Sequence, residues 1–125
     1  FSMNKNHQFT NLPVWENLMQ FVKLIYAISS TFPPEEKEGI TRRIRTRIVD
    51  LPVLVASGTR NGIQPVSAEN MRKAAEVLFE VETLLYVCSQ IGILKKSEFE
   101  SYQEDMRKIG EDLHNISSRI EKKFK

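Results

Sequence analysis

Apolar residues alternate at intervals of three and four along the second half of the sequence, and this spacing restricts the possible folds more than any other feature. It places a continuous apolar stripe along one side of an α-helix, as in helices that pack lengthwise against one another. Two such stripes are present. The first comprises Met71, Ala74, Leu78, Val81, Leu85 and Cys88, and the second comprises Phe99, Tyr102, Met106, Ile109, Leu113, Ile116 and Ile120.

The first half of the sequence predicts two more helices. One begins at Asn11, a favourable N-cap, and ends within residues 29–31, ahead of two prolines. The other runs from Pro34 to Gly58, with a kink at Pro52, which has no N–H to donate to the carbonyl of residue 48. Their stripes comprise Val14, Leu18, Phe21, Ile25 and Ile28, and then Ile40, Ile44, Ile48, Leu51 and Val55.

Local signals mark the ends of the last two helices. We expect Ser67 to cap the third helix and Gly92 to end it in a left-handed turn. Ser97 and Glu100 have the spacing of a capping box, which predicts the start of the fourth helix.

The four predicted helices define the expected architecture. No segment shows the alternating pattern of a strand bounded by hairpin turns. The connections are short apart from a loop at residues 59–66. The sequence therefore predicts an all-α, antiparallel up-down-up-down four-helix bundle over residues 11–125. Residues 1–10 are expected to be a flexible N-terminus, and residues 1–2, which precede Met3, to be a remnant of expression.

The cysteine count and the hydropathy pattern indicate a cytoplasmic protein. A single cysteine, Cys88, excludes an internal disulfide framework and fits a reducing compartment. No apolar run reaches the ~18 residues that a membrane-spanning helix needs. The N-terminal stretch has no apolar core of a signal peptide. We expect no membrane partner.

Candidate catalytic groups are few and do not converge. His7 lies in the expected flexible segment, and His114 stands alone beside a core position. No Glu-x-x-His pair is present, so a metal site of the di-iron bundle type is not expected. Cys88 occupies a core position without a histidine partner on its helix, which favours a small buried hydrophobe over a nucleophile. With no glycine-rich phosphate loop either, we predict no enzymatic activity and no cofactor.

A run of arginines on the second predicted helix is the feature that stands above this background. Residues 1–63 hold eight basic and five acidic residues, whereas residues 64–125 hold ten and eleven, so the basic surplus is local to this helix. At 100° per residue, Arg42 faces outward, Arg43 and Arg47 flank the apolar stripe on one edge, and Arg45 flanks it on the other.

The arginine run has two interpretations. In the first, the arginines pair with carboxylates, such as Asp50 three residues after Arg47, glutamates of the third helix, or those of a neighbouring subunit. In the second, they form a surface that contacts nucleic-acid phosphates, because a guanidinium binds phosphate as readily as carboxylate. The nucleic-acid-binding candidates are Arg42, Arg43, Arg45, Arg47, Arg60 and Lys37.

The ordered motifs of the chain resemble a known family. They include Phe9-x-x-Leu12-x-Val14-Trp15, Thr31-Phe32-Pro33, Gly39-Ile40-Thr41, Leu51-Pro52 with Ala56 and Gly58, and Ala75, Leu78, Glu80 and Glu82 in the third helix. This set resembles the four-helix-bundle proteins named for the intervening sequences of bacterial 23S ribosomal RNA genes. The resemblance covers residues 9–120 and implies a cytoplasmic bacterial protein that assembles into a ring of five.

The resemblance also implies partners. The family includes the accessory variability determinant of diversity-generating retroelements, a basic ring that binds nucleic acid and a reverse transcriptase. A homopentamer would bury a second apolar seam on the third helix, formed by Val77, Leu84 and Ile91, which are therefore the oligomer-interface candidates.

The sequence departs from the family pattern after Pro52. The family usually reads Ile-Pro-x-Asn-Ile-Ala-Glu-Gly, whereas this chain has Leu54 and Ser57 at the Asn and Glu positions. A role that depends on those two polar side chains is not expected here. The sequence thus favours a non-enzymatic, ring-forming protein associated with RNA or DNA. The alternative is a structural or protein-interaction module whose arginines make salt bridges between subunits.

Overall fold

The computed structural model describes residues 12–60 and 62–125. The predictions for residues 1–10, for the cap at Asn11 and for His7 lie outside this range. The elements are α1 (Pro13–Ser29), the 3₁₀ turn η2 (Pro34–Glu36), α2 (Ile40–Ile48), α3 (Asp50–Thr59), α4 (Pro65–Gln90) and α5 (Lys96–Lys123). The described residues contain no β-strand, so the all-helical prediction is confirmed. None of the helices in this part of the chain is long and apolar enough to span a membrane.

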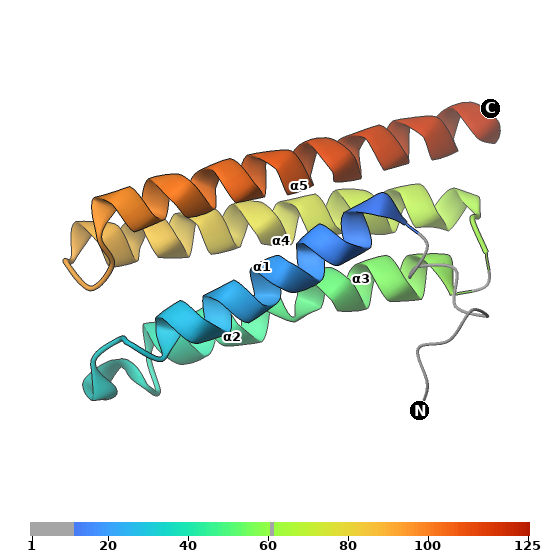
Figure 1. Ribbon diagram of the computed structural model, residues 1–125. Coiled ribbons are helices and arrows are strands. Elements are labelled where there is room, and N and C mark those ends of the chain that lie inside the picture. Colours follow the sequence, from blue (N-terminus) through green and yellow to red (C-terminus); the bar gives the residue numbers. More distant parts are fainter. Residues whose placement is uncertain (1–11, 61) are drawn as a thin grey trace.

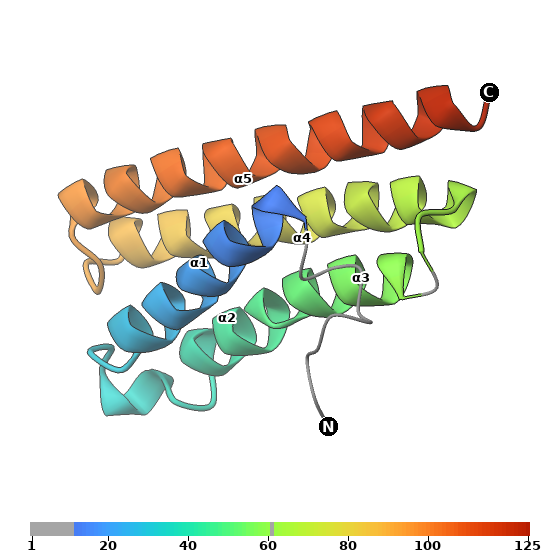
Figure 2. The same cartoon turned by 45° about the vertical axis from the view of Figure 1, so that its right-hand side comes forward.

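The two longest helices, α4 and α5, lie side by side (Figure 1). Helix α3 packs against α4, and α1 contacts α5. In Figure 1 the chain runs right to left along α1, back along α2 and α3, right to left along α4, and back along α5. The turned view shows α2 and α3 following one another as a single bent rod beside α4 (Figure 2). This order is compatible with the antiparallel arrangement expected from the short connections.

The core is formed by the apolar stripes that the spacing predicts. Every residue of the two stripes in the second half of the chain is buried, from Met71 to Cys88 and from Phe99 to Ile120. In the first half, Ile28 and Ile40 are only partly buried, because they lie near helix ends, and the other stripe residues are buried. Four apolar surfaces therefore meet in one continuous core.

The second predicted helix is divided. Its first turn is the separate 3₁₀ turn η2, and the helical path is interrupted again at Val49, three residues before Pro52. Because Pro52 has no N–H, the carbonyl of Ile48 loses its partner one turn back, and the helix breaks there. The kink is confirmed, whereas the uninterrupted helix from Pro34 is not.

Two predicted caps are wrong by a few residues. The cap residue of α4 is Gln64, and Ser67 lies three positions later, where its Oγ accepts a hydrogen bond from the Gln64 N–H at 3.0 Å. Likewise α5 starts after Lys95, whose N–H donates to Glu98 Oε1 at 3.3 Å, so Ser97 is inside the helix. In each case the side chain at the third helical position accepts a hydrogen bond from the backbone N–H of the cap residue, but in a different register.

The predicted end of α4 is confirmed. Gly92 has a φ of +85°, a conformation that glycine adopts without strain. Its N–H donates to the carbonyl of Ser89 at 3.2 Å, and the N–H of Ile93 donates to the carbonyl of Cys88 at 3.0 Å. These two bonds are the pattern of a Schellman motif.

Candidate functional site

The four arginines of α2 do not act as a single set, because the structure gives each a different environment. Arg47 is the most constrained. Its Nε and Nη2 donate to the two carboxylate oxygens of Glu80 on α4, each at 2.9 Å, and its Nη1 donates to Asp50 Oδ2 at 2.6 Å. It therefore bridges α2, α3 and α4 at the break before Pro52. The predicted pair with Asp50 is confirmed, as is pairing with a glutamate of α4.

The Arg47–Glu80 pair also shifts the titration of the carboxylate. The hydrogen bonds from Arg47 lower the pKa of Glu80 below its ordinary value, and the charges of Arg47 and Arg43 lower it further. Burial of the carboxylate opposes this shift. Glu80 is thus an ionised partner at neutral pH, and it neutralises part of the basic run.

Arg45 binds the C-terminal end of α1. Its Nε donates to Ser29 Oγ at 2.8 Å, and its Nη2 donates to Ser30 Oγ at 3.0 Å and to the carbonyl of Tyr26 at 3.2 Å. The guanidinium also lies 5.0 Å from the centre of the Tyr26 ring. A cation at this position satisfies a terminal carbonyl and complements the negative end of the helix dipole. Arg45 is therefore a bundle contact.

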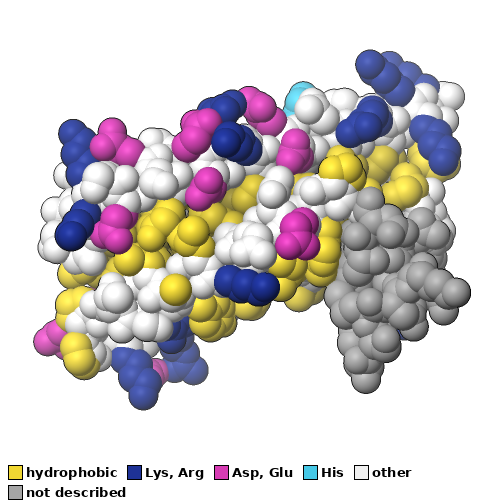
Figure 3. All heavy atoms as spheres, in the orientation of Figure 1, with side chains coloured by type: hydrophobic (Ala, Val, Ile, Leu, Met, Phe, Trp, Pro, Cys, Tyr) yellow, Lys and Arg dark blue, Asp and Glu magenta, His cyan; other side chains and the backbone are white. Residues whose placement is uncertain are grey.

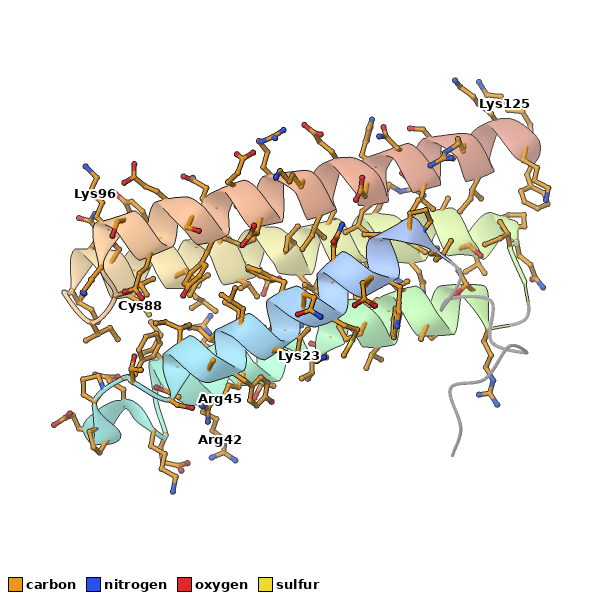
Figure 4. The ribbon with its side chains drawn as sticks, viewed as in Figure 1. Lys23, Arg42, Arg45, Cys88, Lys96 and Lys125 are labelled. Atoms are coloured by element: carbon orange, nitrogen blue, oxygen red, sulfur yellow. The ribbon has the colours of Figure 1, made fainter. Side chains whose placement is uncertain are left out.

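Arg42 and Arg43 remain on the outer surface. Figure 4 shows the Arg42 side chain extending away from the bundle, beyond Arg45. Arg42 is paired with Glu38 one turn earlier, in an ion pair whose side chains are 69% and 71% exposed. The side chain of Arg43 is exposed and makes no hydrogen bond or ion pair with any residue that the structure describes. It is the arginine of this run whose charge is least satisfied.

An open groove of about 730 Å³ lies between α2 and α4 beside these residues. Arg42, Arg43 and Arg47 line it together with Glu38 and Glu80, and Leu84 and Val87 contribute an apolar part. Because Arg47 and Arg42 are already paired, the charge available to a ligand here comes mainly from Arg43.

The structure separates the two other cationic candidates. Lys37 is exposed three residues before the start of α2. Arg60 follows the last residue of α3, at the opposite end of the α2–α3 rod (Figure 1). At 1.5 Å per residue, the two helices separate these positions by roughly 30 Å. Arg60 therefore does not extend the surface formed by Arg42 and Arg43.

The family model described as 23S rRNA-intervening sequence protein matches residues 10–115. The chain belongs to the 23S rRNA-intervening sequence protein family. A comparison with curated proteins found no match. The family assignment covers most of the bundle, from the segment before α1 into the second half of α5.

The segment that follows Pro52 packs closely against α4. The side-chain amide of Asn70 donates to the carbonyl of Leu54 at 3.0 Å and to Ser57 Oγ at 3.2 Å. A Cβ added at Gly58 would lie 2.7 Å from Asn70 Cβ. Gly58 is therefore a close-approach residue within α3, and its predicted role as the residue that ends the helix is wrong.

The proposed apolar seam of α4 is only partly on the surface. Val77 is buried in the core of its own chain, Leu84 is partly buried, and Ile91 is 56% exposed. Sequence reasoning missed two larger apolar side chains on this helix, Phe79 at 69% and Tyr86 at 51% exposure. Their seven-residue spacing places them on one outward side, a signal that was present in the sequence.

The groups considered for catalysis remain isolated. Cys88 is fully buried, and its burial raises the pKa of the thiol to about 11. His114 is exposed on α5. Within residues 12–60 and 62–125, no group of three or more His, Cys, Asp or Glu is placed to hold a metal ion. Cys88 is therefore a core residue whose thiol stays protonated at neutral pH.

Proposed function

We propose that this protein is a nucleic-acid-associated, non-catalytic member of its family, an antiparallel up-down-up-down bundle that contacts phosphates through the exposed edge of α2. The observation that carries the proposal is the state of Arg43, an exposed guanidinium that makes no hydrogen bond or ion pair with the described residues and acts on Glu80 only through its charge. Arg42 lines the same groove as Arg43, and Lys37 is an exposed cation shortly before α2. Arginine suits this role because its planar fork binds phosphate through two hydrogen bonds.

The internal contacts of Arg45 and Arg47 support a smaller set of phosphate-contacting residues than the whole arginine run. Arg45 and Arg47 make their hydrogen bonds within the chain, so their removal would weaken the bundle rather than a ligand contact. Arg42 is paired as well, with Glu38, but that pair is exposed on both sides and does not link two helices. This leaves Lys37, Arg42 and Arg43 as the proposed phosphate contacts.

Salt-titrated binding to a labelled 20-nucleotide RNA, single-stranded and duplex, tests the proposal. The variant Arg42→Gln/Arg43→Gln is expected to bind more weakly, with a log–log salt slope smaller in magnitude by about 1.4 to 1.8, because two phosphate contacts are lost. The matched control Arg107→Gln/Lys108→Gln removes two charges from the exposed face of α5 and should leave the slope unchanged. Absence of wild-type binding at low salt, or an unchanged slope in the α2 variant, contradicts the proposal.

Assembly into a ring is a second proposal, supported by the apolar surface of α4. Phe79, Tyr86 and Ile91 are each more than half exposed, and Val87, on the side of α4 that faces α2, is 39% exposed. Exposed aromatic and aliphatic groups on one helix are typical of a protein–protein contact. In a ring of five the contact joins two different faces of neighbouring copies, since a contact between identical faces closes as a dimer.

Sedimentation at micromolar concentration tests the ring. The wild-type chain is expected to sediment as a pentamer, and Phe79→Ser/Ile91→Ser as a monomer with unchanged helicity. Val53→Ser/Val66→Ser, which changes two exposed valines outside this surface, is the matched control and should stay assembled. A monomeric wild-type chain contradicts the proposal. A reverse transcriptase partner is what the family resemblance implies, and a cytoplasmic location is an expectation from the sequence.

A further inference from the structure

The last turns of α5 carry a second concentration of positive charge, at the end of the bundle away from Arg42. Arg119, Lys122, Lys123 and Lys125 are all exposed. The one acidic residue in this segment, Glu121, is already bound by Arg72 of α4, whose Nη1 lies 2.8 Å from Glu121 Oε1. Figure 3 shows the resulting group of basic side chains at the upper right, and Figure 4 labels Lys125 there.

The charge at this end exceeds what the helix itself requires. Cations in the last turn complement the negative end of the helix dipole, whose equivalent charge is about half an elementary charge. Four cations with one acid that is paired elsewhere leave a clear positive excess. Among the described residues, Arg119 makes a single long hydrogen bond, from Nε to the carbonyl of Asn115 at 3.4 Å, and no ion pair.

An aromatic ring lies among these charges. Phe124 is 44% exposed between Lys123 and Lys125, and Lys123 Nζ lies 5.6 Å from the centre of its ring. Next to it, Ile63, Ile116 and Ile120 form an apolar groove whose rim carries Arg119 and Lys123. Arg60 leaves α3 at the same end of the bundle (Figure 1).

We propose that this basic end of the bundle, defined by Arg119, Lys122, Lys123, Phe124 and Lys125, is a binding surface for single-stranded nucleic acid. The cations contact successive phosphates, and a base stacks on Phe124. Cations that follow the backbone and an aromatic side chain that stacks a base are the two components of single-strand recognition. This surface is separate from the exposed edge of α2, and the proposal for it does not depend on the proposal for α2.

The structure favours this ligand over an anionic membrane. Amphipathic helices bind bilayers through an exposed apolar face. The apolar face of α5 is instead buried in the core, with Ile116 at 7% and Ile120 at 4% exposure. Phe124 alone of this segment presents an exposed aromatic ring, which is enough to stack a base but offers little area to a bilayer.

Fluorescence anisotropy with labelled 12-nucleotide oligouridylate, measured on the full chain from 20 to 300 mM NaCl, tests the inference. Lys122→Gln/Lys123→Gln is expected to lower affinity at least tenfold at 50 mM salt and to reduce the magnitude of the slope by about 1.4. Lys95→Gln/Lys96→Gln removes two adjacent lysines at the other end of α5 and should change neither quantity. Phe124→Ala should lower single-strand affinity about tenfold and duplex affinity much less.

Each outcome decides between the two basic surfaces. If only Arg42→Gln/Arg43→Gln weakens binding, the α2 proposal stands and this inference is wrong. If only the lysine variant weakens it, the inference stands and the α2 proposal is wrong. If Phe124→Ala binds as tightly as the wild type, the proposed stacking of a base on Phe124 is wrong.

Vesicles containing phosphatidylserine serve as the competing ligand, and binding to them without binding to the oligonucleotide overturns the inference. The changed side chains are exposed, and thermal unfolding of each variant verifies the fold.

Discussion

Arg47 on α2 holds Glu80 on α4 through two parallel hydrogen bonds of 2.9 Å, from Nε and Nη2 to the two carboxylate oxygens. The same guanidinium reaches Asp50 at the start of α3. Arg47 belongs to a basic run in the sequence, but in the structure it links α2, α3 and α4. This contact divides the arginine run into residues that hold the bundle together and residues that face solvent.

The Arg47–Glu80 pair predicts a dependence of stability on acid. Because the pKa of Glu80 is lowered in the folded protein, the unfolded chain takes up this proton first as the pH falls. The contribution is complete above the ordinary carboxyl value of 4.5 and is lost as the pH falls through the lower folded value. Glu80→Gln should therefore lower the melting temperature at pH 7 and make the decline below pH 4.5 less steep. Glu76→Gln, an exposed neighbour on α4, serves as control, and an identical acid profile for both variants contradicts the prediction.

Replacement of Arg45 should destabilise the bundle without affecting nucleic-acid binding. Arg45→Gln removes three hydrogen bonds to the end of α1 and the contact with the Tyr26 ring. We expect a loss of about 1–2 kcal/mol in the free energy of unfolding, measured by urea denaturation. Arg42→Gln, whose pair with Glu38 is exposed, should stay close to wild type. A larger effect at Arg42 than at Arg45 would reverse the assignment of the two residues.

Gly58 should tolerate no side chain. In Gly58→Ala the new Cβ meets Asn70 Cβ at 2.7 Å, so α3 and α4 must move apart. The displacement also disturbs the bonds from Asn70 to Leu54 and from Ser67 Oγ to the Gly58 carbonyl. A loss of about 1–3 kcal/mol is expected from thermal unfolding. Gly110→Ala, in α5, where the nearest atom is a Leu78 methyl at 3.7 Å, is the control and should be neutral or stabilising. Equal effects would show that the α3–α4 approach is not tight.

Cys88 should be unreactive while the protein is folded. The thiol is fully buried, and burial raises its pKa to about 11. Modification by an aromatic disulfide reagent at pH 8 should therefore proceed at the rate of unfolding and should accelerate in urea. Since the unfolded thiol ionises near its ordinary value of 9.0, stability should fall as the pH rises from 9.0 towards 11. Cys88→Ala should remove this part of the alkaline decline. Rapid labelling under native conditions contradicts the buried position.

The helical bundle and its core follow from the sequence, because the spacing of apolar residues depends on helix geometry alone. The stripes from Met71 to Cys88 and from Phe99 to Ile120 are buried as predicted. The Schellman turn at Gly92 and the break before Pro52 were also foreseeable, since each depends on one residue type with a fixed backbone preference. The positions of the other caps were not, because several serines and glutamates near each helix start could have made the same bonds.

Only the tertiary structure decided what the charged residues do. Sequence spacing identifies neighbours along one helix, such as Asp50 for Arg47, but not the residue that an adjacent helix brings near. The bond of Arg45 to the end of α1, the separation of Arg60 from Arg43, and the approach of Gly58 to Asn70 all depend on how the helices cross. Periodicity thus determined which side of each helix is buried, and helix packing determined which arginines remain available for a ligand.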